Sequence, residues 1–577
     1  MKIEIAKTAG FCMGVRRAVE LALDAPGKHA APIYTYGPLI HNPQVLSLFA
    51  EKGITVLKTI PEQGSGTVLV RAHGVPPEDK QRLKAAGFRV VDATCPRVIR
   101  VQTIIRVHAR KGYTTIIVGD RDHPEVIGLV GHAGDSGIVV STMAELEALP
   151  AFDQAIIVAQ TTQNLRFYQQ VKAWAQSTFP QYKAYDTICD STEKRQAEIK
   201  QLADRVEAVI VVGGKDSGNT RRLAEIAAET GKPAFHVETE ADLKSCCLDN
   251  YNRVGITAGA STPNWIIKRV YRELEKLPAR RHAGLVRILY RAMQTLLLTN
   301  VYVAMGAGCL CLAGTRLLEI KPSAAPVAVA MLYVLSMHLL NHLTGTAEDE
   351  YNDPERARFY EQNRLGLSVM AIAAGGLGIL SASAMGAVAF VILLVMSLLG
   401  LSYNLYLLPG RFGFKFRRIK DIPGSKTCLI AVAWGVVAVL LPGITGQGTV
   451  SAASGVVFVW ATALVFARTA FFDLLDVQGD RIMGKETLPI LLGSRKTVVL
   501  LKSILVGCML LVCVGSAVGL ISGLGFLIAL CPAAMLALVH AYEKGLMLPS
   551  MRLEFMVESL FLLSGFLTLL WMMADTF

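Results

Sequence analysis

Three cysteines stand in the same kind of sequence context, and that context favours metal binding. Cys12, Cys95 and Cys189 each follow a short strand-like stretch and a turn, and each precedes a run with helical periodicity. A thiol at a helix N-terminus faces unpaired backbone N–H groups and the positive end of the helix dipole, which favours the thiolate. Because thiolates bind metals and iron–sulfur clusters, the repeat predicts a single site built by three converging units.

The elements that would position these thiols are those of a soluble α/β protein. Further short apolar runs end in polar loops, and helical patterns separate them, which predicts parallel strands with functional groups at their C-terminal ends. The polar loops carry the other candidate site residues, namely His41, His73, His123, Glu125, Thr161, Ser217, Asn219 and Ser261. Each alone is compatible with an ordinary loop or turn. Together they form a donor-rich set that suits an anion such as a diphosphate.

Composition divides the 577-residue chain into two halves. Charged residues are frequent up to about Leu277, whereas long apolar stretches beyond Val286 suit only a bilayer. The net charge of +12 lies largely in short loops between hydrophobic spans, which argues against nucleic acid as a partner. The N-terminal segment lacks a signal-peptide pattern, so the first half is expected in the cytosol with its cysteines reduced or metal-bound. The remaining cysteines read as small apolar residues.

The second half is expected to be all-α and to cross the membrane about nine times. The spans should begin near Ile288, Ala325, Leu365, Met385, Thr427, Val450, Thr497, Leu524 and Phe555. Lysine and arginine accumulate in alternate loops, among them 407–426 and 468–496, whereas the loops near Ser383, Gly446 and Ser522 contain none. This asymmetry predicts a multi-pass protein of the cytoplasmic membrane, with the soluble half and the basic loops on the cytosolic side.

One loop of the membrane half has the residue types of a magnesium site. Asp473, Asp476 and Asp480 share one helical face at a membrane boundary if the helix continues, and Arg481 and Lys485 follow them. Carboxylates near lipid are costly, which argues against their being ordinary solvated caps. Paired carboxylates can hold Mg²⁺ against a diphosphate, with the two basic residues as counter-charges.

The first half resembles the LytB family of 4-hydroxy-3-methylbut-2-enyl diphosphate reductases. The resemblance spans Met1 to about Lys276 and rests on nine motifs in the order of that family: GFCMGV, IHNPQV, RAHGV, DATCP, DHPEV, QTTQN, TICDST, KDSGNT and AGAST. It implies three pseudo-repeated α/β domains around a central iron–sulfur cluster. The implied reaction converts (E)-4-hydroxy-3-methylbut-2-enyl diphosphate to isopentenyl and dimethylallyl diphosphate, the last step of the non-mevalonate pathway, with electrons from a ferredoxin or flavodoxin.

By matching position, the resemblance also implies roles for the individual residues. Cys12, Cys95 and Cys189 would hold one 4Fe–4S cluster by three of its irons, leaving the fourth free for the substrate hydroxyl. Glu125 would be the catalytic acid, with Thr161 beside the hydroxyl. The diphosphate would be held by His41, His73, His123, Ser217, Asn219 and Ser261. Gly218 stands where some members carry a second serine, and a modest effect on binding is expected.

The second half resembles the UbiA family of intramembrane prenyltransferases over roughly 285–577. The resemblance rests on the number of spans, the D-x-x-D-x-x-x-D…G-K-x-T-L-P loop and the basic segment Arg417–Lys420. The first motif of the family departs here, since His342 follows Asn341 where an aspartate is expected, and acids reappear only at Glu348, Asp349, Glu350 and Asp353. This departure puts the first Mg²⁺ site in doubt.

The resulting hypothesis is a fusion of a reductase at 1–277, a basic juxtamembrane linker at 278–287 and a UbiA-like transmembrane domain at 288–577. Isoprenoid diphosphates and the lipid bilayer are its expected partners. Two alternatives stay open from the sequence: the first half as a non-catalytic metal sensor, and the second as a degenerate membrane anchor or polyprenyl carrier.

Overall fold

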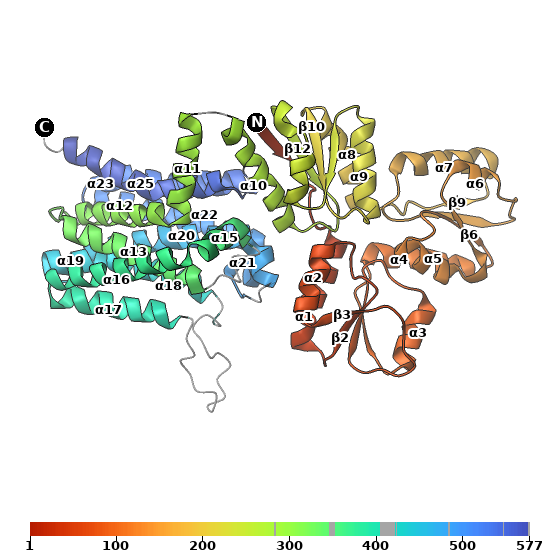
Figure 1. Ribbon diagram of the computed structural model, residues 1–577, viewed down its shortest axis with the longest axis horizontal. Coiled ribbons are helices and arrows are strands. Elements are labelled where there is room, and N and C mark those ends of the chain that lie inside the picture. Colours follow the sequence, from red (N-terminus) through yellow and green to blue (C-terminus); the bar gives the residue numbers. More distant parts are fainter. Residues whose placement is uncertain are drawn as a thin grey trace. The chain divides into compact units, whose positions relative to one another are not determined.

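The structure is a computed structural model, and it describes residues 1–281, 284–344, 352–403, 422, 424–482, 485–545, 547 and 549–574. The chain folds into two compact units, one formed by residues 1–281 and the other by residues 282–577 (Figure 1). The first unit is α/β and the second is helical, as the composition predicts.

The first unit contains three parallel sheets of four strands each. The first sheet has the order β1-β12-β10-β11, formed by Lys2–Ile5, Arg253–Ala258, Ala208–Val212 and Ala234–Val237. The second has the order β3-β2-β4-β5, formed by Ile54–Leu57, Ile33–Tyr36, Thr67–Val70 and Arg89–Asp92. The third has the order β7-β6-β8-β9, formed by Gly137–Val140, Thr114–Val118, Ala155–Ala159 and Lys183–Ala184.

Ten helices accompany these sheets (Figure 1). They are α1 Met13–Lys28, α2 Pro43–Glu51, α3 Pro77–Ala85, α4 Pro96–Ala109, α5 Pro124–Ala133, α6 Met143–Glu147, α7 Leu165–Thr178, α8 Asp190–Ala203, α9 Gly218–Glu229 and α10 Asn264–Arg281. The strands β4, β8 and β10 are buried along their whole length, as parallel strands covered on both faces should be. Each sheet packs against its own apolar clusters, so the unit has three cores.

The chain passes from one sheet to the next at three places, and a cysteine stands at each of them. Cys12 joins β1 of the first sheet to α1, which leads into the second sheet. Cys95 joins β5 of the second sheet to α4, which leads into the third. Cys189 joins β9 of the third sheet to α8, which returns to the first. This circular order explains why thiols far apart in sequence share a common centre.

The second unit consists of helices around one large apolar core. The helices begin with α11 Leu285–Leu298, α12 Val301–Leu317, α13 Ala324–Thr344, α15 Pro354–Gln362, α16 Arg364–Ala384 and α17 Ala387–Ser402. They continue with α18 Ser425–Gly435, α19 Leu441–Gln447, α20 Ala452–Ile482, α21 Leu488–Leu492, α22 Ser494–Ala517, α23 Leu524–Ile528, α24 Leu530–Glu543 and α25 Met551–Ala574.

The expected number of nine membrane spans is too high for the described residues. Seven helices are long and apolar enough to cross a membrane, and α11 with α12 would make an eighth although they bend by 73°. The bend falls at Asn300, which has a left-handed backbone with φ 57°. The span expected from Met385 is α17, whose 16 residues extend only about 24 Å, short of a hydrocarbon core of about 30 Å. The remaining helices have the pattern of a multi-pass membrane protein.

Several sequence features of the second half lie outside the described residues. They are the acidic residues Glu348, Asp349 and Glu350, the basic segment Arg417–Lys420 and His282 of the basic linker.

Candidate functional site

All three cysteines cap the N-termini of helices, as their sequence context predicts. Cys12, Cys95 and Cys189 are the N-cap residues of α1, α4 and α8. The Sγ atom of Cys12 accepts a hydrogen bond from the Val15 N–H at 3.4 Å. A side chain at Gly14 would collide with the Cys95 thiol, and its Cβ would lie 2.9 Å from that of Cys95. The absence of a side chain at this glycine therefore lets α1 approach the second thiol.

Their position at helix N-termini does not by itself give these thiols the expected preference for the thiolate form. Burial raises the pKa of Cys95 and of Cys189, and neighbouring thiols raise both further, against the lowering effect of backbone N–H groups at the helix starts. Three thiolates in one small space repel one another and lose hydration. The arrangement therefore favours thiolates only when a nearby positive group, such as a bound metal, compensates them.

One cavity of about 90 Å³ brings together every candidate residue of the first half. The lining includes Cys12, Cys95, Cys189, His41, His73, His123, Glu125, Thr161, Ser217, Asn219 and Ser261. They come from all three sheets and reach the cavity from loops that follow strands or from the first turns of helices. These groups therefore lie together, as their positions after strand ends predict, while their chemical roles remain predictions.

Three histidines form a compact cluster on this cavity. The ring centroids of His41 and His73 are 4.8 Å apart, and that of His123 lies 5.8 Å and 5.4 Å from them. Burial lowers the pKa of all three, for His123 to about 4, and nearby positive groups including Arg71 lower it further. The rings are therefore neutral near pH 7 unless an anion is bound.

The histidine nitrogens lie within 4.8 Å of one another, a spacing that would also accommodate a metal ion. The surroundings favour an anion instead, because Arg71 adds positive charge and α9 begins at the same cavity with Ser217 as its N-cap. Buried polar atoms without a hydrogen-bond partner include His41 Nε2, His73 Nδ1 and Asn219 Nδ2. Such atoms are costly unless a ligand satisfies them.

Glu125 is a buried carboxylic acid. Its side chain is 1% exposed, its Oε1 accepts a hydrogen bond from the Thr161 N–H at 2.7 Å, and its Oε2 lies 2.8 Å from Thr161 Oγ1. Burial raises its pKa to about 7, although the bonds from Thr161 and the charge of Arg222 oppose the shift. About half of the Glu125 side chains therefore carry a proton at neutral pH.

A buried cation that the sequence did not predict lies near the cavity residues Cys12 and Cys189. Arg195 on α8 is 3% exposed, donates to Ser191 Oγ at 2.8 Å and to the Gly10 carbonyl oxygen, and interacts electrostatically with Cys12 and Cys189. Arg195 therefore connects the turn before Cys12 to the helix that follows Cys189. The signal was present in the sequence, because Arg195 occupies a position of the buried stripe of α8 where an apolar residue is usual.

In the second unit, the three aspartates lie on one helix, because α20 continues to Ile482. Asp473 and Asp480 are 5% and 4% exposed, so they are not solvated caps. Thr427 Oγ1 donates to Asp473 Oδ2 at 2.6 Å. Asn352 Nδ2 donates to Asp480 Oδ1 at 2.9 Å, and Lys485 Nζ lies 3.6 Å from the same oxygen. Asn352, which precedes α15, therefore contacts the aspartate helix α20, and Arg481 is a half-buried residue of that same helix.

The altered first motif belongs to a network of ion pairs. Arg356 Nη1 lies 3.4 Å from His342 Nε2, its Nε lies 3.4 Å from Asp353 Oδ2, and its Nη2 pairs with Glu554 of α25. Arg356 is 8% exposed. A cation thus stands beside the position where the family pattern places a metal-binding aspartate.

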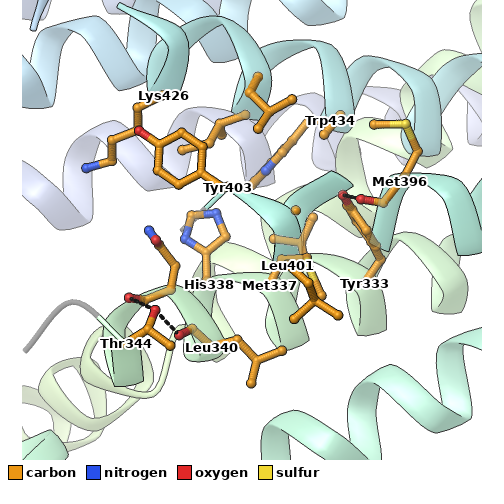
Figure 2. A pocket seen from close by; sticks show the side chains of 16 residues that line it. Tyr333, Met337, His338, Leu340, Thr344, Met396, Leu401, Tyr403, Lys426 and Trp434 are labelled. Carbon is orange, nitrogen blue, oxygen red and sulfur yellow. Dashed lines mark hydrogen bonds between the residues drawn. The ribbon is translucent and has the colours of Figure 1, made fainter. Parts of the chain in front are cut away.

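A pocket of about 220 Å³ lies next to the aspartates in the second unit. Figure 2 shows the polar ends of Lys426, His338 and Thr344 on one side and apolar side chains such as Met337 and Leu401 on the other. Because Thr427 bonds to Asp473, the Lys426 side of the pocket adjoins the aspartate helix.

Behind the pocket wall, a buried ion pair fixes the aromatic residue Trp434. Arg468 Nε donates to Glu558 Oε1 at 2.9 Å, and the guanidinium carbon lies 5.6 Å from the Trp434 ring. Both members of the pair are buried, with Arg468 6% and Glu558 2% exposed. Ionisable groups inside a membrane domain of this kind usually serve a functional site.

Comparisons with known proteins divide the chain in the same way. The family model described as LytB protein matches residues 3–275, and that described as UbiA prenyltransferase family matches residues 300–565. The 4-hydroxy-3-methylbut-2-enyl diphosphate reductase of Pelobacter propionicus is 41% identical over 270 residues, covering 47% of this chain and 96% of that protein. The reductase of Aquifex aeolicus is 40% identical over 283 residues, covering 48% and 96%.

Among solved structures, the first unit matches the reductase from Plasmodium falciparum with 25% identity and a TM-score of 0.45, over 48% of this chain and 87% of that one. The second unit matches a UbiA homolog from Archaeoglobus fulgidus bound to GPP and Mg²⁺ with 17% identity and a TM-score of 0.33, over 47% and 97%.

Proposed function

The chain belongs to the LytB protein family over its first half and carries a UbiA prenyltransferase-family domain in its second, and on this premise we propose a two-part isoprenoid enzyme. The first unit reductively dehydroxylates (E)-4-hydroxy-3-methylbut-2-enyl diphosphate. The substrate takes up two electrons and two protons, and it yields one water and either isopentenyl or dimethylallyl diphosphate. The observation that carries this proposal is the single cavity that combines three thiols, an anion-binding set and a buried acid.

Cys12, Cys95 and Cys189 would hold a 4Fe–4S cluster. The fit is supported by their convergence on one cavity, by the close approach permitted at Gly14, and by the need for a positive group to compensate three thiolates. When bound, the cluster would supply single electrons and a Lewis-acidic iron without a protein ligand. Arg195 holds the turns that carry two of the cysteines and adds a positive charge beside them.

The diphosphate would bind among His41, His73, His123, Ser217, Asn219 and Ser261. The nitrogens of His41, His73 and Asn219 that lack a partner can donate hydrogen bonds, and the N-terminus of α9 provides further N–H donors. The Ser217 and Ser261 hydroxyls bond to one another and can turn toward a bound anion. Binding an anion would also raise the pKa of the histidines, so that one or more can take up a proton and add a charge-assisted bond. This end of the cavity would therefore bind the negatively charged diphosphate group.

Glu125 would donate the proton that leaves with the substrate hydroxyl as water. Its burial keeps the acid form populated near pH 7, and Thr161 fixes its orientation through two hydrogen bonds. The second proton adds to the carbon fragment, and its point of attachment decides between the two isomeric products. The two electrons come from an external donor, for which a ferredoxin or flavodoxin is suited.

The second unit would bind a prenyl diphosphate through Mg²⁺ held by Asp473, Asp476 and Asp480, on the cytosolic side with the first unit. Lys485 would balance the charge, and the pocket of Figure 2 would accommodate apolar parts of the substrates. Transfer of the prenyl group to an acceptor would follow. An anchor or carrier would bind the lipid without transferring it, so a Mg²⁺-dependent transfer assay with several acceptors distinguishes these roles.

The reductase proposal is tested with the full chain purified without oxygen. We expect a protein with stoichiometric iron and sulfide that converts the hydroxylated substrate to the two five-carbon diphosphates when a reduced viologen supplies electrons. Product identity is read by mass spectrometry. A protein that binds metal but never consumes the substrate would instead act as a metal sensor.

A further inference from the structure

The three candidate cysteines lie directly beneath one exposed face of the first unit. The residue that follows each of them, Met13, Pro96 or Asp190, begins a helix and is exposed, with Met13 65% accessible. The three helix starts adjoin one another, because Gly14 lies against Cys95 and Arg97 Nη2 pairs with Asp190 Oδ2 at 2.6 Å. We call this surface, formed by residues 13–17, 96–100 and 190, the cysteine face.

The α1 and α4 parts of the cysteine face are basic, whereas α8 begins with the acidic residues Asp190 and Glu193, of which Asp190 pairs with Arg97. Arg16, Arg17 and Arg100 are exposed on its α1 and α4 parts, and neither helix has an acidic residue in its first turn. No ion pair involves these three arginines in the part of the chain that the structure describes. Arg17 instead donates to the carbonyl oxygen of Thr94 at 2.9 Å, which holds α1 against the start of α4. The positive charge is therefore available to a partner.

Apolar side chains lie among these charges. Met13 is 65% exposed and Ile99 is 38% exposed, whereas residues of their type usually lie in a core. Exposed apolar side chains among charged ones fit the anatomy of a protein–protein interface, which has an apolar core and a polar rim. An acidic protein would complement the arginines and bury the two apolar side chains.

We infer that the cysteine face is the docking surface of an acidic one-electron carrier protein. The inference rests on the proposed function, since the reaction takes two electrons from outside for each substrate. The thiols line the cavity, and each is followed in the chain by an exposed residue of this face, so a carrier docked here would lie close to the cysteine site. Charge complementarity would mainly accelerate association and make it dependent on salt.

The test compares two double variants of the full chain that change the net charge equally. R16E/R100E reverses the charge of the α1 and α4 parts of the cysteine face, and among the described residues neither arginine forms a hydrogen bond or ion pair with a site residue. K84E/K111E is the matched control, because Lys84 lies on α3 and Lys111 lies past the opposite end of α4, about 20 Å along that helix. Reduced flavodoxin, an acidic flavin carrier, is the protein donor, and methyl viologen and a sulfonated viologen are small donors of different charge.

For R16E/R100E we expect the second-order rate constant with flavodoxin to fall by at least about tenfold at low ionic strength, with a flatter salt dependence. Binding of oxidised flavodoxin should weaken in parallel, while turnover with both viologens and the iron content should stay at the wild-type level. The control should behave like wild type. Equal losses in the two double variants would overturn the docking surface while leaving the reductase intact. Absence of viologen-driven turnover in the wild-type chain would refute the proposed function itself.

Discussion

Replacing Glu125 by glutamine tests the proposed proton donor with little disturbance of the cavity. The carboxyl group accepts from the Thr161 N–H through one oxygen and meets Thr161 Oγ1 through the other. A glutamine amide can reproduce both contacts, since its oxygen accepts from the N–H and its NH₂ group donates to the hydroxyl. The variant therefore copies the shape of the protonated acid but cannot release its proton.

The size of the effect follows from the burial of Glu125. With a pKa near its ordinary value of 4.5, about 0.3% of the carboxyl groups would be protonated at pH 7, whereas the raised pKa of about 7 gives about half. General acids of this kind contribute about 10²–10⁴ in rate, or about 2.7–5.4 kcal/mol in activation free energy. We expect Glu125→Gln to lose turnover within this range and to keep the KM for substrate nearly unchanged.

The pH dependence of turnover gives an independent check. Because the acid form of Glu125 is the active one and its pKa is raised, wild-type turnover should be full below about pH 7 and fall as pH rises through it. The residual activity of Glu125→Gln should lack this fall. The assay is anaerobic turnover from pH 6 to 9 with a reduced viologen and a measured cluster content. A loss below about tenfold with the cluster intact, or an unchanged pH profile in the variant, would show that another group donates the proton.

Four further outcomes are expected. Cys95→Ser should lose the cluster absorbance and the iron while keeping the fold, because a hydroxyl is a poor replacement for a thiolate on iron; normal anaerobic turnover would contradict this assignment. Arg195→Met should shift the midpoint potential of the cluster negatively in a spectroelectrochemical titration, because a buried positive charge beside two thiolates is lost, and Arg195→Lys should restore much of it; an unmoved potential would leave only a structural role. A chain ending at Leu277 should remain soluble and active, since the first unit has its own three cores; insolubility would show dependence on the second unit. Asp476→Ala should abolish Mg²⁺-dependent binding of a polyprenyl diphosphate, and His342→Ala should affect this binding much less. Equal affinities in the wild-type protein and both variants would mark the second unit as an anchor.

Local patterns predicted the elements around the cysteines well. The strand, turn and helix around Cys12 and Cys95 follow from apolar runs and from periodicity, and both are short-range signals. The gathering of the polar loops at one cavity followed from the rule that parallel strands place functional groups at their C-terminal ends. The roles of the individual side chains came from the family resemblance.

Features that depend on contacts between residues far apart in the sequence were not predictable. Arg195 lies beside the cysteines because it bonds to Gly10 across 185 positions, and Arg356 pairs with Glu554, 198 residues away. The raised pKa of Cys95 depends on burial and on thiols from other sheets. The span expected from Met385 failed for a simpler reason, since hydropathy detects an apolar run but does not locate the end of the helix, and α17 is too short.

The central claim is that three cysteines of one chain hold a cluster whose remaining iron is open to substrate. Mössbauer spectra of ⁵⁷Fe-enriched, full-length protein test it directly, because iron bound by a protein thiolate differs from iron with another ligand. The account predicts three similar irons and one distinct iron, whose signal changes when the hydroxylated diphosphate is added. Four equivalent irons, or spectra that the substrate leaves unchanged, would contradict it.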